Sequence, residues 1–106
     1  MVNREIVDVV KKYLSELELK GLRISKAFIY GSQVHGTATS ESDIDLMLVS
    51  PQFDFEYEEY LPFIWFSMIR SDNHIEPFIV GEKRFLTDDM SPIIGIVKHE
   101  GFEIAA

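Results

Sequence analysis

Two apolar segments joined by a short polar stretch constrain this chain more than any other feature. The first ends at Gly31-Ser32, and the second, residues 43–49, begins with Asp43 and Asp45. Side chains two residues apart on a strand point to the same face, so both carboxylates are expected side by side at the start of a buried strand. Two close anions repel, and a divalent cation that prefers oxygen ligands would remove the cost of burying them. The pattern therefore predicts a cation site beside a turn whose glycine, hydroxyl and backbone N–H groups suit a phosphate.

The stretch from Gly31 to Thr39 (GSQVHGTAT), followed by Ser42 to Leu46 (SDIDL), combines residue types, spacing and strand context in one motif. This motif resembles the signature of the polymerase-beta-like nucleotidyltransferase superfamily, and more closely that of the minimal nucleotidyltransferases. The resemblance implies an α+β fold with a small mixed β-sheet flanked by helices. It also implies Mg²⁺-dependent transfer of a nucleoside monophosphate, AMP from ATP, to a hydroxyl acceptor. The alternative is a tight turn and an Asp-capped strand without chemistry.

The resemblance assigns roles to individual residues. Gly31 and Ser32 would contact the β- and γ-phosphates, and Ser42 would complete the nucleotide-binding set. Asp43 and Asp45 would hold one or two Mg²⁺ ions, with the two-metal arrangement expected.

A third carboxylate comes, in the family, from the strand after the acid pair. Glu76 is the only acid within the strand expected over 74–80, so it is assigned that role as metal ligand and proton acceptor. Asp72, in the preceding turn, is the fallback, and His74 is expected to be a neighbour of the site. Pro77 lacks an N–H and predicts an edge position or a strand end here.

Arginine often stands in the family where this chain has Gln33 and His35, which weakens any charge-based grip on phosphate. His35 is expected to be solvated, with a nucleotide contact as the alternative. Lys83 and Arg84 are as consistent with surface cations as with groups that approach a triphosphate.

Size and composition fit one domain spanning residues 1–106, with 46% hydrophobic residues and no cysteine. The absence of cysteine excludes disulfides and thiolate metal sites and suits a cytoplasmic protein. Charges near the N-terminus argue against a signal peptide, and no apolar run is long enough for a membrane span. The net charge of −8, with no basic patch, makes a long nucleic acid an unlikely acceptor.

The remaining pattern predicts the order of elements. Apolar spacing predicts a helix from Asn3, as N-cap, to about residue 20, stopped by Gly21. Further helices are expected to start near Ser32 or Gln33, to span 61–70 with Pro62 in the first turn, and to run from Ser91 to about 100. Strands are expected over 26–30, 43–49, 74–80 and 102–104, the second covered on both faces.

The segment 53–66 holds more aromatic residues than one helix needs to cover a small sheet. Its interpretation stays open between core packing and a base-stacking wall or partner surface. Minimal nucleotidyltransferases are similar to the antitoxin half of MNT–HEPN pairs, so the resemblance implies a HEPN-type protein partner, and an oligomer is possible. Two alternatives stay open: a non-catalytic nucleotide- or partner-binding antitoxin-type module, and a transferase acting on a small molecule.

Overall fold

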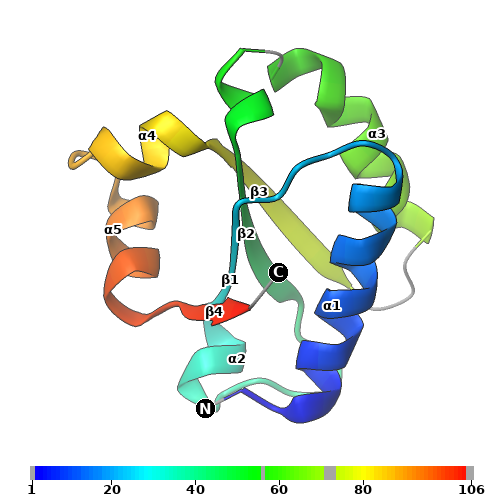
Figure 1. Cartoon of the computed structure of the whole chain (residues 1–106). Coiled ribbons are helices and arrows are strands. Elements are labelled where there is room, and N and C mark those ends of the chain that lie inside the picture. Colours follow the sequence, from blue (N-terminus) through cyan, green and yellow to red (C-terminus); the bar gives the residue numbers. More distant parts are fainter. Residues whose placement is uncertain (1, 56, 71–73, 105–106) are drawn as a thin grey trace.

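A mixed four-stranded sheet forms the centre of the protein (Figure 1). The computed structural model describes residues 2–55, 57–70 and 74–104. In space the strands run in the order β3-β2-β1-β4. Their bounds are Lys26–Tyr30 for β1, Ile44–Ser50 for β2, Ile75–Gly81 for β3 and Phe102–Ile104 for β4. The predicted α+β class with a small mixed sheet is confirmed.

Strand β2 lies in the middle of this arrangement. It pairs antiparallel with β1 and parallel with β3, while β4 pairs antiparallel with β1. Every residue of β2 except Asp45 is buried, which confirms a strand covered on both faces. Pro77 falls on the edge strand β3, as its missing N–H predicts.

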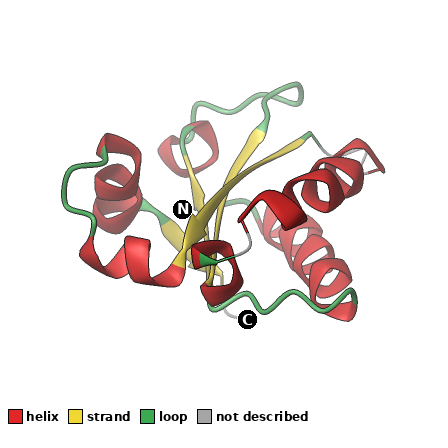
Figure 2. Ribbon diagram, turned by 90° about the horizontal axis from the view of Figure 1, so that it is seen from above, coloured by secondary structure: helices red, strands yellow, loops and turns green. Residues whose placement is uncertain are grey.

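Helices cover both faces of the sheet (Figures 1 and 2). One face packs against α1 (Arg4–Leu19) and α3 (Tyr57–Arg70), and the other against α4 (Glu82–Thr87) and α5 (Pro92–Glu100). The alternation along each strand assigns the faces: Leu46 and Leu48 belong to the α1 side, and Met47 and Val49 to the α5 side. Odd-numbered residues of β2, Asp45 included, therefore face the α4 and α5 side.

Capping residues place several helix ends where the sequence predicts them. The Asn3 side chain accepts a hydrogen bond of 2.7 Å from Glu5 N, and Gly21 follows α1 with a φ of +97°. Ser91 accepts a bond of 3.3 Å from Ile94 N at the start of α5. A four-residue helix, α2 (Ser32–His35), follows β1, also as expected.

Two strand boundaries differ from the prediction, and both differences concern the site. Strand β2 begins at Ile44 rather than Asp43. Its pairing with the segment that leads into β3 starts where Ile44 N donates a hydrogen bond of 2.9 Å to His74 O. Strand β3 begins at Ile75, because His74 has a φ of +55°, outside extended conformation. Asp43 and His74 thus lie just outside the strands that carry Asp45 and Glu76.

The middle of the chain also departs from the prediction. Helix α3 begins at Tyr57 rather than 61, so Pro62 lies inside the helix instead of in its first turn. Helix α4 was not predicted, because its start depends on a distant residue: the Asp54 carboxylate accepts a bond of 2.9 Å from Lys83 N. Arg84 pairs with Asp88 at 3.1 Å, so this cation serves the end of α4.

In the described part of the chain, no helix is both long enough and apolar enough to cross a membrane.

The buried central strand predicts a strong response to truncation. Leu48→Ala removes a side chain with no exposed surface and should lower the free energy of unfolding by about 2–5 kcal/mol, measured by urea denaturation. Leu86→Ala, at a residue that is 65% exposed on α4, is the control and should change it by less than about 0.5 kcal/mol. Equal losses in the two variants would contradict the placement of β2.

Candidate active site

Three polar side chains form a row across neighbouring strands. Tyr30 on β1 is in register with Asp45 on β2, and Asp45 is in register with Glu76 on β3. Residues paired directly across a sheet point to the same face, so the phenol and both carboxylates share the α4 and α5 side of the sheet. The structure thus brings together two of the three acids that the sequence selected, and adds Tyr30.

Gly31 lies against this row. Its φ is +77°, and a Cβ built on it would overlap the Asp45 carboxylate oxygen Oδ2. Only glycine satisfies both the left-handed backbone and the lack of space. The backbone of Gly31 therefore borders Asp45 directly.

The electrostatics of Asp45 reflect this crowding. Its pKa is raised, chiefly by burial, then by the negative charges of Glu76 and Asp43, and by a hydrogen bond to the Glu76 carboxyl. A hydrogen bond between two carboxyl groups needs a proton on one of them. Burial first, and then Asp45 and Glu76, raise the pKa of Tyr30 to about 12, which keeps its phenol neutral.

Asp43 stands slightly apart from the pair. Its side chain is 56% exposed, and Oδ1 lies 4.0 Å from Nδ1 of His74. Across residues 2–55, 57–70 and 74–104, the side chains as placed form no group of three or more His, Asp or Glu that already surrounds one ion. Asp45 and Glu76 adjoin each other, while Asp43 turns toward His74, as expected for carboxylates that repel one another.

The donor set nevertheless fits a hard divalent cation. All three groups supply carboxylate oxygens, and burial together with the charges of Glu76 and Asp43 raises the pKa of Asp45, a cost that a cation would relieve. Asp72, the fallback third acid, lies outside the described residues.

Helix α2 is fixed at its far end rather than free in solvent. His35 Nε2 lies 2.9 Å from Glu100 Oε1, at the end of α5. The expectation that His35 is simply solvated is therefore wrong, because the fold brings the end of α5 beside α2. Since α2 follows Gly31-Ser32 directly, this contact also helps to hold the turn.

Ser42 holds the loop between α2 and β2. Its hydroxyl accepts a hydrogen bond of 2.8 Å from Thr39 N and lies 3.3 Å from Thr39 Oγ1. Gln33 lies below this loop, 9% exposed, and its Nε2 approaches Asp43 O at 3.5 Å. Both residues border Asp43, but on the side of the sheet away from Glu76.

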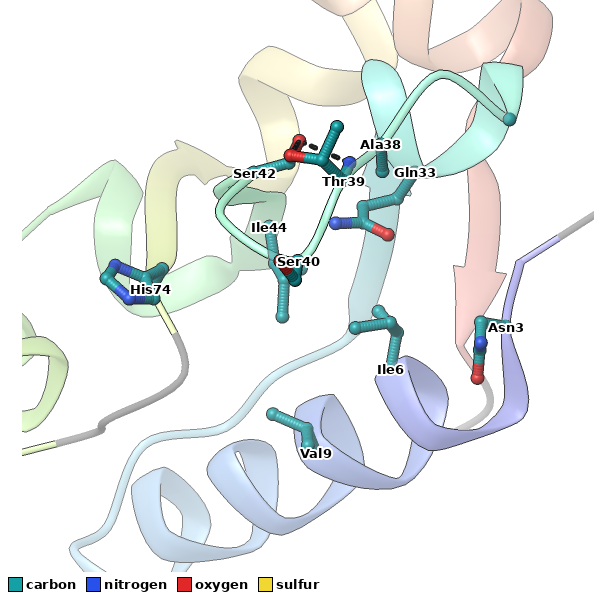
Figure 3. A pocket seen from close by; sticks show the side chains of 11 residues that line it. Asn3, Ile6, Val9, Gln33, Ala38, Thr39, Ser40, Ser42, Ile44 and His74 are labelled. Carbon is teal, nitrogen blue, oxygen red and sulfur yellow. Dashed lines mark hydrogen bonds between the residues drawn. The ribbon is translucent and has the colours of Figure 1, made fainter.

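A pocket of about 520 Å³ opens on this second side (Figure 3). Helix α1, the loop after α2 and the start of β2 form its walls. The side chains of Ile6 and Val9 face the loop from α1, and His74 closes one end. The pocket therefore backs onto the acid row instead of containing it.

The aromatic segment divides between the two interpretations that its composition left open. Phe53 is buried and contacts Tyr60 edge to face with ring centroids 6.0 Å apart, so this pair belongs to the core. Phe55, Trp65 and Phe66 are 88%, 53% and 61% exposed, which leaves an apolar surface on and before α3.

Two site residues escaped the sequence analysis. Tyr30 immediately precedes Gly31, and pairing it with Asp45 across the turn would have indicated its place beside the acids. Gln33 was considered only as a substitution for arginine, and its place beside Asp43 depends on how α2 packs on β1 and β2.

Comparisons with known proteins agree with this geometry. The family described as "Nucleotidyltransferase domain" matches residues 7–99 of the chain. Among solved structures, the chain is similar to a candidate nucleotidyltransferase from Sulfolobus solfataricus, with a TM-score of 0.59 and 18% sequence identity over 76% of this chain and 70% of that chain. A search among curated proteins gave no matching sequence. Because the sequence identity is low, this similarity shows that the two proteins share a fold and nothing more.

A pair of glycine variants tests the contact between the turn and Asp45. Gly31 and Gly36 have nearly equal φ angles of +77° and +75°, but a Cβ at Gly36 would meet nothing within 4 Å. The ψ angles differ, −143° at Gly31 and 15° at Gly36, so alanine is strained at both positions but more at Gly31, where it must also displace Asp45. We expect Gly31→Ala to unfold at lower urea than Gly36→Ala, with a further loss on the order of 1–3 kcal/mol. The part of the Gly31→Ala loss that is due to the contact should disappear in an Asp45→Ala background, and an equal loss in both backgrounds would show that the carboxylate does not border the turn.

Removing the charge of Asp45 should stabilise the protein when no metal ion is present. Folded Asp45 keeps its proton to a higher pH than it does in the unfolded chain, so between the two pKa values the folded state binds more protons and stability falls as pH rises. We expect Asp45→Asn to melt a few degrees above the wild type at neutral pH in a chelator, measured by scanning calorimetry.

The difference should shrink as the pH falls toward the ordinary range of an aspartate, because wild-type Asp45 is then neutral as well. Asp8→Asn, at an exposed position on α1, removes the same charge and serves as control. A lower melting temperature for Asp45→Asn at neutral pH would contradict the charge repulsion.

Proposed function

Because the chain belongs to the nucleotidyltransferase domain family and is a nucleotidyltransferase enzyme, we propose that it transfers AMP from ATP, with Mg²⁺, to a hydroxyl of a partner protein. One observation carries the proposal. The backbone of Gly31 lies against the carboxylate of Asp45, so the phosphate-binding turn and the acids share one edge of the sheet. Glu76, in register with Asp45, extends this set toward β3.

Nucleotidyltransferase domains typically use a divalent metal. In this chain Asp43, Asp45 and Glu76 would hold it: Asp45 and Glu76 are in register on neighbouring strands, and Asp43 precedes Asp45 by two residues. When bound, Mg²⁺ supplies positive charge that neutralises the triphosphate and orients it for in-line displacement. A two-metal arrangement is the form that we propose.

The chain's own residues bind and orient the nucleotide. Gly31 and Ser32 face the β- and γ-phosphates with backbone N–H groups and a hydroxyl, and Ser42 supports the loop beside them. The neutral phenol of Tyr30 flanks the acids and is available as a hydrogen-bond donor.

Glu76 is placed to accept a proton. In the proposed reaction the acceptor hydroxyl oxygen forms a bond to the α-phosphorus, and the bond from that phosphorus to the bridging oxygen breaks. Pyrophosphate leaves with the electron pair, and the hydroxyl proton passes to the Glu76 carboxylate. Glu76 is exposed on an edge strand, so an acceptor can approach it from solvent.

A protein acceptor agrees with the surface of this chain better than RNA does. The net charge of −8 repels a phosphate backbone. The exposed Trp65 and Phe66 on α3 offer an apolar area of the kind that protein partners cover. A HEPN-type partner, as in MNT–HEPN pairs, is the specific form of this proposal.

Labelling with nucleotides tests the reaction. The protein is incubated with Mg²⁺ and each α-labelled nucleoside triphosphate, alone and with a HEPN-type protein, and the products are separated by mass. We expect ATP to label the partner with AMP and the double variant Asp43→Asn/Asp45→Asn to give no label, because it lacks the oxygen charge that holds the ion. Calorimetry should likewise show that Mg²⁺-dependent ATP binding is lost in this variant.

The matched control is Asp8→Asn/Glu18→Gln, which removes two charges from exposed positions on α1. Circular dichroism verifies that all variants fold. Wild-type labelling by the acid-pair variant would refute the metal assignment, whereas label confined to low-mass products would replace the protein acceptor with a small molecule.

A further inference from the structure

The pocket of about 520 Å³ behind the acid row has uncharged walls. Ile6 and Val9 of α1 and Ile44 of β2 supply apolar surface, while Ser40 of the loop adds a hydroxyl (Figure 3). Of the described residues that line the pocket, none is Lys, Arg, Asp or Glu, and His74 is the one with a titratable side chain. A phosphate or another ion would find no counter-charge here.

Gln33 gives the pocket its specific polar group. The residue is 9% exposed, and Figure 3 shows its amide directed from α2 toward the space above Ile6. Its Nε2 makes one long contact, 3.5 Å, to Asp43 O. Within the part of the chain that the structure describes, no hydrogen-bond donor reaches its carbonyl oxygen. Among the described residues Tyr13 has the fully buried side-chain polar atom without a partner, so the Gln33 oxygen instead borders the open space of the pocket, where a ligand can donate a hydrogen bond to it.

These properties specify a ligand that is flat, uncharged and able to form hydrogen bonds at its edge. The volume lies within the range of small-molecule sites, about 300–1,000 Å³. A nucleobase has two flat faces and an edge with both donors and acceptors, which matches a pocket that combines aliphatic side chains with uncharged amides and hydroxyls. We propose that this pocket binds the nucleobase of a nucleotide or nucleoside.

The pocket adjoins the acids across the edge of the sheet. Ser42 and Ile44, on either side of Asp43, both line it. His74 also lines it, while its Nδ1 lies 4.0 Å from Asp43 Oδ1. A base seated here therefore belongs to a molecule that can reach the reacting groups. The choice of a nucleobase rests on the proposed function, and the base comes from the donor nucleotide or from a nucleotide acceptor.

Binding of free nucleosides in a chelator tests the proposal, because a nucleoside carries no phosphate and needs no metal ion. Adenosine, guanosine, cytidine and uridine are titrated into the full chain and followed by backbone amide NMR. We expect at least one nucleoside to bind with a Kd on the order of 1 mM and to shift the amides of the loop around Ser40. Gln33→Leu, which removes the amide, and Ala38→Phe, which fills the pocket, should each weaken binding by tenfold or more.

Ser67→Phe, in the separate groove of about 680 Å³ between α1 and α3, adds similar bulk elsewhere and should bind as the wild type does. Spectra of the unliganded variants establish that each is folded. Equal nucleoside affinity in wild type, Gln33→Leu and Ala38→Phe would overturn the proposal, and so would the lack of binding by all four nucleosides.

Competition identifies the source of the base. A nucleoside that is displaced by ATP with Mg²⁺ assigns the pocket to the donor base, and one that binds together with ATP assigns it to an acceptor. The variant Asp43→Asn/Asp45→Asn separates this proposal from the proposed function, since it should lose AMP transfer and keep nucleoside binding. Transfer by the wild type without any nucleoside binding would refute the pocket alone.

Discussion

The repulsion among carboxylates at one edge of the sheet is the constraint on which the rest of the structure depends. Strand β2 has a partner on each side, so the backbone of Asp45 is fixed in register with that of Glu76. The backbone of Gly31 lies directly against the Asp45 carboxylate. The repulsion between Asp45 and Glu76 is relieved when a proton is shared between the two carboxylates or when a cation binds to them. A fold that holds like charges together in this way sacrifices stability for a site.

Short contacts between distant segments hold the parts that the strands do not. Helix α2 has four residues and little stability of its own, yet His35 connects it to Glu100 on α5. The loop after it is held by Ser42 and Thr39. The Gly31-Ser32 turn is thus fixed by the rest of the fold, as the preorganised binding of a phosphate there would require.

The sequence predicts those features that depend on local pattern. Strands with apolar runs, helices with capping residues and the edge position of Pro77 follow from neighbours in the chain, and all three are confirmed. The start of α4 depends on Asp54, and the contact of His35 depends on Glu100, 65 residues away. The placement of Asp43 and His74 outside their strands depends on pairing between β2 and β3. Tyr30 joins the site only through strand register. Such long-range pairings leave no periodic trace in a single sequence.

The two faces of the sheet differ in charge where β2 begins, so each face suits a different kind of ligand. The side of Asp45 and Glu76 is anionic and suits a metal ion with phosphates, whereas the side of Gln33 is neutral and suits a group without charge. Asp43 belongs to both sides: its carboxylate lies near His74, and its carbonyl oxygen accepts from Gln33. A ligand that moves Gln33 would act on Asp43 through the backbone, without adding charge to the acids. The neutral side and the anionic side thus meet at Asp43, at the edge of the strand.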